Sequence, residues 1–173
     1  EIAFNEQKTA LFVERKLRLF GLTVHPRMAG TGVIASISSG DSKKSIALRA
    51  DLDALPIIEK TGLSYSSSHQ GMMHACGHDG HTSMLLGAAQ YLAQHREFNG
   101  TVYFIFQPAE ENEGGGRQLV KEGFFNKYPI DAIYGMHNWP GLAVGKFAIR
   151  SGPVMAAYDI FDITIKGKGG HAA

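Results

Sequence analysis

Apolar residues recur at intervals of three or four positions in two parts of the chain, which is the spacing of an amphipathic helix. The first stripe consists of Ala10, Val13, Leu17 and Phe20. Asn5 precedes it as a capping residue and Gly21 follows it, so a helix is predicted between these positions. The second stripe predicts a long helix over residues 78–95, and a shorter helix is predicted over residues 114–122.

Other segments have the patterns of β-strands, in which apolar residues alternate with polar ones or form short unbroken runs. The predicted strands are residues 32–38, 45–52, 101–106, 132–136, 144–149 and 158–165. Residues 101–106 (TVYFIF) are almost wholly apolar, as in a strand buried on both faces. Residues 59–73, rich in Ser, Gly and His, are predicted to form a loop. The alternation of strands and helices predicts an α/β fold with a twisted, mixed and largely parallel sheet flanked by helices.

Composition and charge argue against two functional classes, nucleic-acid-binding proteins and membrane-spanning proteins. The 173 residues include 17 Lys and Arg against 16 Asp and Glu, which gives a formal net charge of +1. A nucleic-acid-binding protein would be expected to have a basic face, so we predict no nucleic-acid partner. The apolar runs are far shorter than the ~20 residues that span a bilayer, so no membrane span is predicted.

The chain has a single cysteine, Cys76, and so cannot form an internal disulfide. This composition favours a reducing compartment, and we predict a cytoplasmic location. The histidines are clustered around this cysteine, at His69, His74, His78 and His81. The chain also begins without an initiator Met and stops directly after a strand-like run, and we interpret it as an internal piece of a longer protein.

Polar residues follow three of the predicted strands at the point where each strand ends. They form the segments 49–53 (RADLD), 107–111 (QPAEE) and 136–140 (MHNWP). In open α/β sheets ligands bind beyond the carboxyl ends of the strands, so these segments are expected to converge. The segment 74–81 (HACGHDGH) lies at the start of the long helix and can face the same edge.

The converging groups are a thiolate, imidazoles and carboxylates, which suit Zn²⁺, Ni²⁺, Co²⁺ or Mn²⁺ better than Mg²⁺ or Ca²⁺. If the backbone at Glu110 and Glu111 stays extended, the two side chains point to opposite sides. One carboxylate could then bind metal while its neighbour transfers protons from water. This division of roles is typical of a metal-assisted hydrolase.

Several of these residues also have simpler interpretations. His74 and His81 are as well explained as hydrogen-bond donors near the helix start as by direct metal ligation. Asp53 could cap a turn before Pro56 or orient a ligand, and Trp139 could line an acyl pocket or belong to the core. Glu113 is interpreted as surface charge. The run of glycines at 114–116 lacks the Gly-Lys-Ser/Thr ending of a phosphate-binding loop.

Five ordered motifs, spread over essentially the whole chain, resemble the M20 metallopeptidase superfamily. They are ALRADLDALPI, MMHACGHDGHTSMLLGAA, VYFIFQPAEE, GMHNWP and IKGKGGHAA. The chain is most similar to the amidohydrolase branch, which includes hippurate hydrolases, N-acyl-L-amino acid amidohydrolases and IAA-amino acid (auxin-conjugate) hydrolases. The resemblance implies a metal-dependent enzyme that cleaves the amide bond of N-acyl amino acids to a carboxylate and a free amino acid.

The resemblance also implies roles for individual residues. Cys76 matches the ligand that bridges two metal ions, a place held by an aspartate in the peptidase branches. His78, Glu111 and His137 match the other ligands in this part of the chain. Glu110 matches the catalytic acid and base. Two divalent ions per subunit, Zn, Mn, Ni or Co, are therefore expected in the full-length protein.

Other matches concern the surroundings of the metals and the organisation of the protein. Asp53 resembles the aspartate of the HxDxxP motif of related peptidases, and Asp51 stands where those have a histidine ligand. His171 resembles a lid-domain histidine that reaches the partner's active site in dimeric relatives, so a homodimer is expected. Residues 1–155 would be an N-terminally incomplete catalytic domain, and 156–173 the first strand of a truncated α+β lid. The family's last metal-binding histidine has no counterpart in this chain.

Three other functions remain open at this point. A di- or carboxypeptidase of the same superfamily would use the same ligands on a different substrate. A metal-binding domain without catalysis would need no base, which the presence of Glu110 argues against. A cysteine hydrolase would use Cys76 as a nucleophile with a histidine base.

Overall fold

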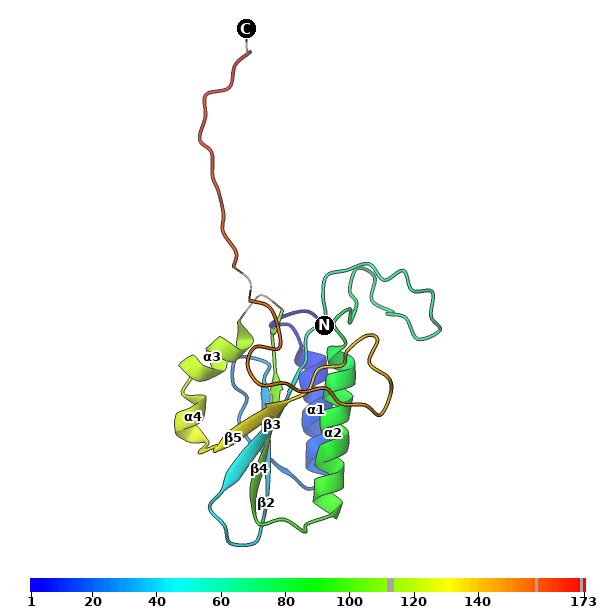
Figure 1. Cartoon of the computed structure of the whole chain (residues 1–173), viewed down its shortest axis with the longest axis vertical. Coiled ribbons are helices and arrows are strands. Elements are labelled where there is room, and N and C mark those ends of the chain that lie inside the picture. Colours follow the sequence, from blue (N-terminus) through cyan, green and yellow to red (C-terminus); the bar gives the residue numbers. More distant parts are fainter. Residues whose placement is uncertain (112–113, 158, 172) are drawn as a thin grey trace. The chain divides into compact units, whose positions relative to one another are not determined.

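A five-stranded mixed sheet, in the order β1-β2-β4-β3-β5, forms the centre of the computed structural model (Figure 1). The strands are β1 (Thr23–Val24), β2 (Val33–Ser39), β3 (Ser45–Asp51), β4 (Gly100–Gln107) and β5 (Ala132–Gly135). The structure describes residues 1–111, 114–157, 159–171 and 173. These fall into two units, 1–138 and 139–173, and the sheet belongs to the first.

The direction of the strands decides where their ends lie. β2 pairs with β1 and β4 in antiparallel fashion, whereas β3 pairs in parallel with both β4 and β5. In this register Asp51, the last residue of β3, lies beside Gln107, the last residue of β4. The carboxyl ends of β3, β4 and β5 therefore share one edge of the sheet.

Helices cover both faces of the sheet in the first unit (Figure 1). They are α1 (Gln7–Leu19), α2 (His78–Gln94), α3 (Gly115–Lys121) and α4 (Phe124–Lys127). The strands alternate in which face they bury: Phe104 packs in the core with α1 and α2, whereas Ile105 packs with residues of α3 and α4. Burial or half-burial on both faces explains the nearly unbroken apolar run of β4.

The structure confirms the α/β class and the mixed sheet, and it corrects several details. Asn5 does not cap α1: Glu6 occupies the N-cap position, and the Asn5 amide donates to the backbone oxygen of Ala3 instead. The two-residue strand β1 and the single-turn helix α4 were not predicted, because elements this short have no measurable periodicity. Residues 59–73 form no helix or strand, as predicted for a loop.

The second unit contains no helix or strand among its described residues, 139–157, 159–171 and 173. The predicted strand at 144–149 is therefore wrong for this structure, and so is the part of the 158–165 strand that is described; Tyr158 lies outside the described residues. Alternation alone does not hold a strand, because its backbone groups need a neighbouring strand. The predicted boundary at residue 155 stays a prediction. None of the helices described reaches the length and apolarity that crossing a bilayer requires.

The core on the α1–α2 face should dominate the stability of the first unit. Phe104 is fully buried, so Phe104→Ala should lower the free energy of unfolding by about 3–5 kcal/mol, through lost burial and a residual cavity. Phe12→Ala removes the same ring from a position that is 53% exposed and should cost about 1 kcal/mol or less. Urea unfolding followed by circular dichroism measures both, and equal losses would contradict this account of the core.

Candidate metal centre

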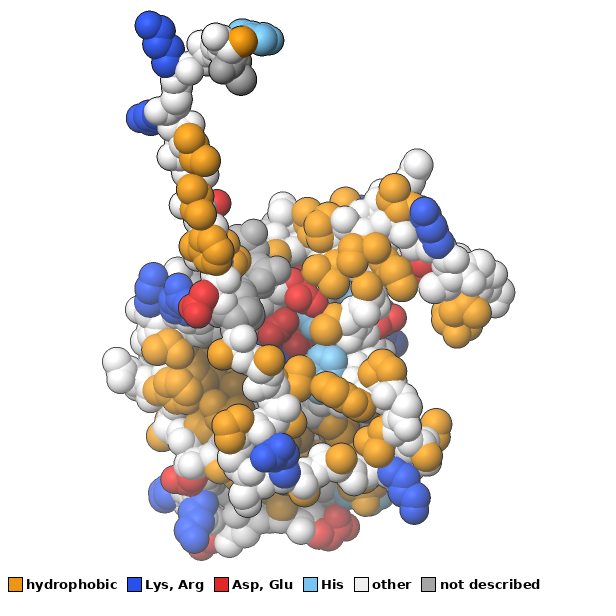
Figure 2. Space-filling view, turned by 45° about the horizontal axis from the view of Figure 1, so that its top comes forward, with side chains coloured by type: hydrophobic (Ala, Val, Ile, Leu, Met, Phe, Trp, Pro, Cys, Tyr) orange, Lys and Arg blue, Asp and Glu red, His pale blue; other side chains and the backbone are white. Residues whose placement is uncertain are grey.

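Potential metal ligands gather where the carboxyl ends of β3 and β4, the segment after β5, and the start of α2 come together. Three groups of possible ligand atoms occur among the described residues: Cys76, His78 and His137; Asp51, His78 and His81; and His78, Glu110 and Glu111. Within each group the ligand atoms lie within 4.8 Å of one another. Acidic and histidine side chains are seen together on the face shown in Figure 2.

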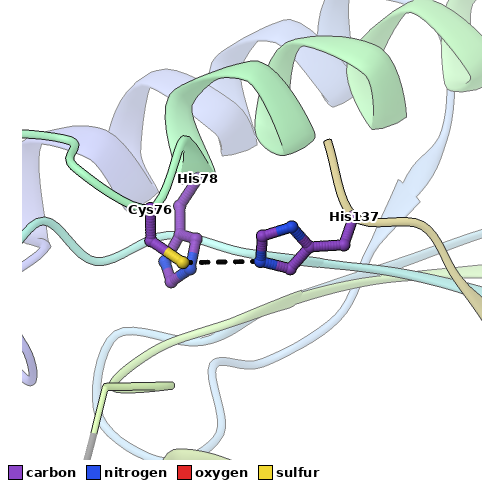
Figure 3. Close-up of side chains that lie close together, drawn as sticks. All are labelled: Cys76, His78 and His137. Atoms are coloured by element: carbon purple, nitrogen blue, oxygen red, sulfur yellow. Dashed lines mark hydrogen bonds between the residues drawn. The ribbon is translucent and has the colours of Figure 1, made fainter. Parts of the chain in front are cut away.

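The first group joins the start of α2 to the segment after β5. The Cys76 Sγ lies 3.4 Å from Nε2 of His137, and both point toward His78 (Figure 3). Two ligands of one tetrahedral metal ion, each about 2.0–2.3 Å from it, lie about 3.3–3.8 Å apart. The spacing of this pair therefore fits a shared metal ion.

His78 is common to all three groups and is completely buried. Its Nδ1 lies 3.2 Å from a carboxylate oxygen of Asp53, so this nitrogen carries the proton and donates it there. Its Nε2 makes no hydrogen bond to the described residues. A histidine whose other ring nitrogen donates to a carboxylate is the common arrangement of a metal ligand.

Carboxylates surround the free nitrogen of His78. Nε2 lies 3.6 Å from an oxygen of Asp51, 3.9 Å from Glu110 and 3.8 Å from Glu111. Burial alone would lower the pKa of His78, but the hydrogen bond to Asp53 and these negative charges raise it. The same negative potential favours a bound cation.

Asp53 connects the end of β3 to the two glutamates. Its oxygens accept the backbone N–H groups of Glu110 at 3.0 Å and Glu111 at 2.9 Å, in addition to the proton of His78. Burial raises its pKa, but these donors outweigh burial and lower the pKa overall. Asp53 is thus an ionised, buried group that contacts both the imidazole and the backbone of the proposed base.

The two glutamates differ from expectation, because the backbone here is not extended. β4 ends at Gln107 and the chain turns at Ala109, whose φ is +50°. As a result both carboxylates face His78 instead of pointing to opposite sides. They differ in exposure: the Glu110 side chain is 40% exposed and Glu111 is 20% exposed, with its Oε1 buried and without a hydrogen bond to the described residues.

Burial and the neighbouring charge of Glu111 raise the pKa of Glu110. A carboxylate with a raised pKa holds a proton more readily, which suits a group that must accept and return one near neutral pH. Glu111 offers a buried oxygen that nothing described satisfies, which suits a ligand. Exposure, and not strand direction, therefore distinguishes the two glutamates.

A network of polar side chains surrounds these groups, and it includes His81, for which the sequence left open a hydrogen-bonding role or direct ligation. His81 is buried, its Nδ1 lies 2.6 Å from Asp51, and its Nε2 accepts the backbone N–H of Asn138 at 3.0 Å. Since both ring nitrogens are engaged, His81 serves as a hydrogen-bonding residue beside His137. Arg49 donates to the other oxygen of Asp51 at 2.8 Å. In the sequence, the signals for this network were the charged residues of the otherwise apolar β3 segment and the position of His81 in the histidine cluster.

The remaining candidates lie apart from the ligand groups. His74 is half-buried, and its Nδ1 makes no hydrogen bond to the described residues, yet it belongs to none of the three ligand groups found among them. His171 and Trp139 lie in the second unit, so their proposed roles stay predictions. Glu113 lies outside the described residues.

The negative charge around the candidate metal centre affects the pKa of the Cys76 thiol. Burial, followed by the nearby carboxylates of Glu111, Glu110 and Asp51, raises the pKa of Cys76 to about 12. A nucleophilic cysteine needs the opposite shift, toward a lower pKa. A bound cation would reverse this effect, because it stabilises the thiolate.

Comparison with known proteins places this geometry in a family. A family model described as peptidase family M20/M25/M40 matches residues 47–172, which include every member of the three ligand groups. The chain belongs to this family. The M20 resemblance of the sequence motifs is thereby confirmed.

Individual M20 relatives match the whole chain but extend well beyond it. Hippurate hydrolase of Campylobacter jejuni is 45% identical over 173 residues, covering 100% of this chain and 45% of the relative. N-acetyl-L-cysteine deacetylase of Bacillus subtilis is 46% identical over 174 residues, covering 100% of this chain and 41% of the relative. The chain thus spans less than half the length of these relatives.

A solved structure supports the fold. The crystal structure of a Bacillus subtilis protein, described as a dinuclear metal binding peptidase from the M20 family, superposes with a TM-score of 0.79 at 46% identity. The match covers 84% of this chain and 40% of that one. The α/β fold predicted from the sequence is therefore that of an M20 protein.

Gly77 should be needed for the approach of Cys76 to His137. Its φ is +84°, and a Cβ there would lie 2.0 Å from the side-chain nitrogen of Asn138. Gly77→Ala should push the His137 segment away and weaken Zn²⁺ binding by about 10–100-fold, measured by calorimetry. The control is Gly87→Ala, because a Cβ at Gly87 meets nothing within 4 Å. Unchanged affinity in Gly77→Ala would contradict the shared centre.

The raised pKa of Cys76 also predicts how metal binding depends on pH. The thiol is protonated at neutral pH without metal, so a cation must displace this proton, and affinity should rise roughly tenfold per pH unit for this one proton. Calorimetry in buffers of different ionisation enthalpy counts the released protons. Cys76→Ser should release about one proton fewer. The same count in both proteins would show that Cys76 is not a thiolate ligand.

Proposed function

We propose that the protein containing this chain is a metal-dependent amidohydrolase that cleaves N-acyl amino acids, such as N-acetyl or N-benzoyl derivatives, to a carboxylate and a free amino acid. The observation that carries the proposal is the pairing of two adjacent glutamates with different surroundings. Glu110 is partly exposed with a raised pKa, whereas Glu111 presents a buried, unsatisfied oxygen to His78. A site that only stored metal would have no use for the first of these groups.

We infer that Cys76, His78, Glu111 and His137 would hold two divalent ions, Zn, Mn, Ni or Co, in the full-length protein. The donor set of sulfur, imidazole nitrogen and carboxylate oxygen suits these metals. The fit rests on the spacing of Cys76 and His137, and on the unsatisfied Nε2 of His78. Such ions polarise a carbonyl group and make water a stronger nucleophile at neutral pH.

In this mechanism, residues of the chain transfer the proton and hold the base and a metal ligand in position. Glu110 accepts a proton as water adds to the amide carbonyl carbon, and then returns it to the nitrogen as the C–N bond breaks. Asp53 holds the backbone of Glu110 and the imidazole of His78, so the base and a ligand keep a constant relation to each other. Burial and the neighbouring charge of Glu111 raise the pKa of Glu110, which suits it to accept this proton.

The proposal also includes the oligomeric state and the location of the protein. We infer a homodimer in which His171 supports the developing negative charge on the substrate oxygen across the subunit boundary. We also propose a cytoplasmic location, because the single cysteine of the chain is a free thiol that the proposal uses as a metal ligand.

A di- or carboxypeptidase is the second candidate, since the M20 neighbour of known structure is described as a peptidase. The two candidates differ in substrate and share the metal centre, so direct comparison of dipeptides with N-acetyl and N-benzoyl amino acids separates them. A cysteine hydrolase is disfavoured by the raised pKa of Cys76. Alkylation of the thiol in the presence of saturating metal tests this, because a ligated thiolate should be protected.

Replacement of the proposed base provides the main test. In the full-length protein, Glu110→Gln keeps the side-chain shape but cannot accept the proton, so kcat on N-acyl amino acids should fall at least ~100-fold. Metal content should be unchanged, as measured by atomic absorption. A chelator should abolish the wild-type activity, and added metal should restore it.

The matched control is Glu97→Gln, an exposed glutamate for which no partner is described. It should leave both activity and metal content as in the wild type. Full activity in Glu110→Gln would remove the proposed base. If the wild type binds metal but hydrolyses no amide, the alternative of a metal-binding domain without catalysis is favoured.

A further inference from the structure

A buried carboxylate outside the metal centre contacts the segment that carries the two glutamates. Glu6, at the N-cap of α1, has no exposed surface. Its Oε1 accepts the backbone N–H of Ala109 at 2.9 Å, and its Oε2 accepts the hydroxyl of Thr31 at 2.5 Å. Glu6 therefore connects the start of α1 to residues that lie 103 positions further along the chain.

Ala109 is the residue at which the chain turns from β4 toward Glu110. It is completely buried and has a φ of +50°, in the left-handed region that residues with a side chain rarely adopt. Its backbone oxygen accepts the N–H of Gly115 at 2.9 Å, which links Ala109 to the first residue of α3. A Cβ on Gly115 would lie 1.8 Å from the backbone oxygen of Pro108, so the start of α3 packs directly against the backbone before Ala109.

The backbone N–H groups of residues 109–111 donate to side-chain carboxylates instead of to a neighbouring strand. Glu6 accepts the N–H of Ala109, and Asp53 accepts those of Glu110 and Glu111. Three successive N–H groups thus point at two buried carboxylates, as in the backbone concavities that bind anions. Because a buried amide without a partner is unfavourable, these two acceptors define how the turn can fold.

The position of Glu6 in the sequence is also unusual. Glu6, Ala10, Val13 and Leu17 are spaced as one face of a helix, and all four are completely buried. A charged residue on such a stripe is rare unless it is paired. Its carboxylate is paired with the Thr31 hydroxyl and the Ala109 amide, and the contact with Ala109 leads directly to Glu110.

We propose that Glu6 is a positioning residue of the metal centre, which acts through the Ala109 amide to direct the carboxylates of Glu110 and Glu111. The effect on catalysis rests on the proposed function, whereas the effect on the turn and on metal binding does not. Positioning by hydrogen-bond geometry makes a distinctive prediction for Glu6→Gln. The amide oxygen can still accept the Ala109 N–H, and its nitrogen can donate to the Thr31 hydroxyl.

The test compares Glu6→Ala and Glu6→Gln with the wild type in the full-length protein. In Glu6→Ala, the amide hydrogens of residues 109–111 should exchange faster in the metal-free protein, Zn²⁺ affinity should fall about 10–100-fold, and kcat should fall about 100-fold with little change in KM. Glu6→Gln should restore all three to within about threefold of the wild type. Hydrogen exchange by mass spectrometry, calorimetry and steady-state kinetics give the readouts.

Glu14→Gln is the control, because Glu14 lies on the same helix but pairs with Arg27 instead of the turn. It should change none of the three readouts. If Glu6→Ala does not fold, Glu6→Asp replaces it: the shorter side chain withdraws the carboxylate from Ala109 and should show the same losses.

The proposal is overturned if the folded variant that lacks the Ala109 contact keeps normal exchange and metal affinity, or if Glu6→Gln is as impaired as Glu6→Ala. A structural role alone would lower the melting temperature without moving the metal affinity of the folded protein. Failure of the wild type to hydrolyse any N-acyl amino acid would overturn the proposed function only, since exchange and metal binding need no substrate.

Discussion

The parallel pairing of β3 with both β4 and β5 is the constraint on which the candidate metal centre depends. Parallel strands end at the same edge, and the register that sets Asp51 beside Gln107 brings the segments after β3 and β4 together. The start of α2 then supplies Cys76 and His78 at this edge, and the segment after β5 supplies His137. A shift of one strand by one residue would separate these groups and reverse the burial of the strand.

Concentrated negative charge is the energetic consequence of this arrangement. Asp51 is compensated by Arg49 and His81, and Asp53 by His78 and backbone amides. Burial and the charge of Glu111 raise the pKa of Glu110, and Glu111 has a buried oxygen without a hydrogen bond to the described residues. The uncompensated part of the charge thus lies where a cation and a mobile proton are expected to act.

Local patterns were sufficient for the longer elements of the fold. The periods of the apolar residues predicted α1, α2, β2, β3 and β4 to within a few positions, because each buries one or two whole faces. The same reasoning failed where a local pattern lacks a partner: the segment 158–165 alternates like a strand in the sequence, but its described residues, 159–165, form no strand. It also placed the cap of α1 on Asn5, since a buried carboxylate is not expected at the next position.

By itself, the sequence determined which chemistry is available: a thiol, imidazoles and paired carboxylates in ordered motifs, with the α/β elements that present them. Only the tertiary structure decided how those groups are used. It turned Glu110 and Glu111 to the same side, engaged both nitrogens of His81, and placed Glu6 against Ala109. The physical reason is the separation of the interacting residues along the sequence. Periodicity reflects contacts between residues a few positions apart, whereas hydrogen bonds between distant segments form only when the chain folds.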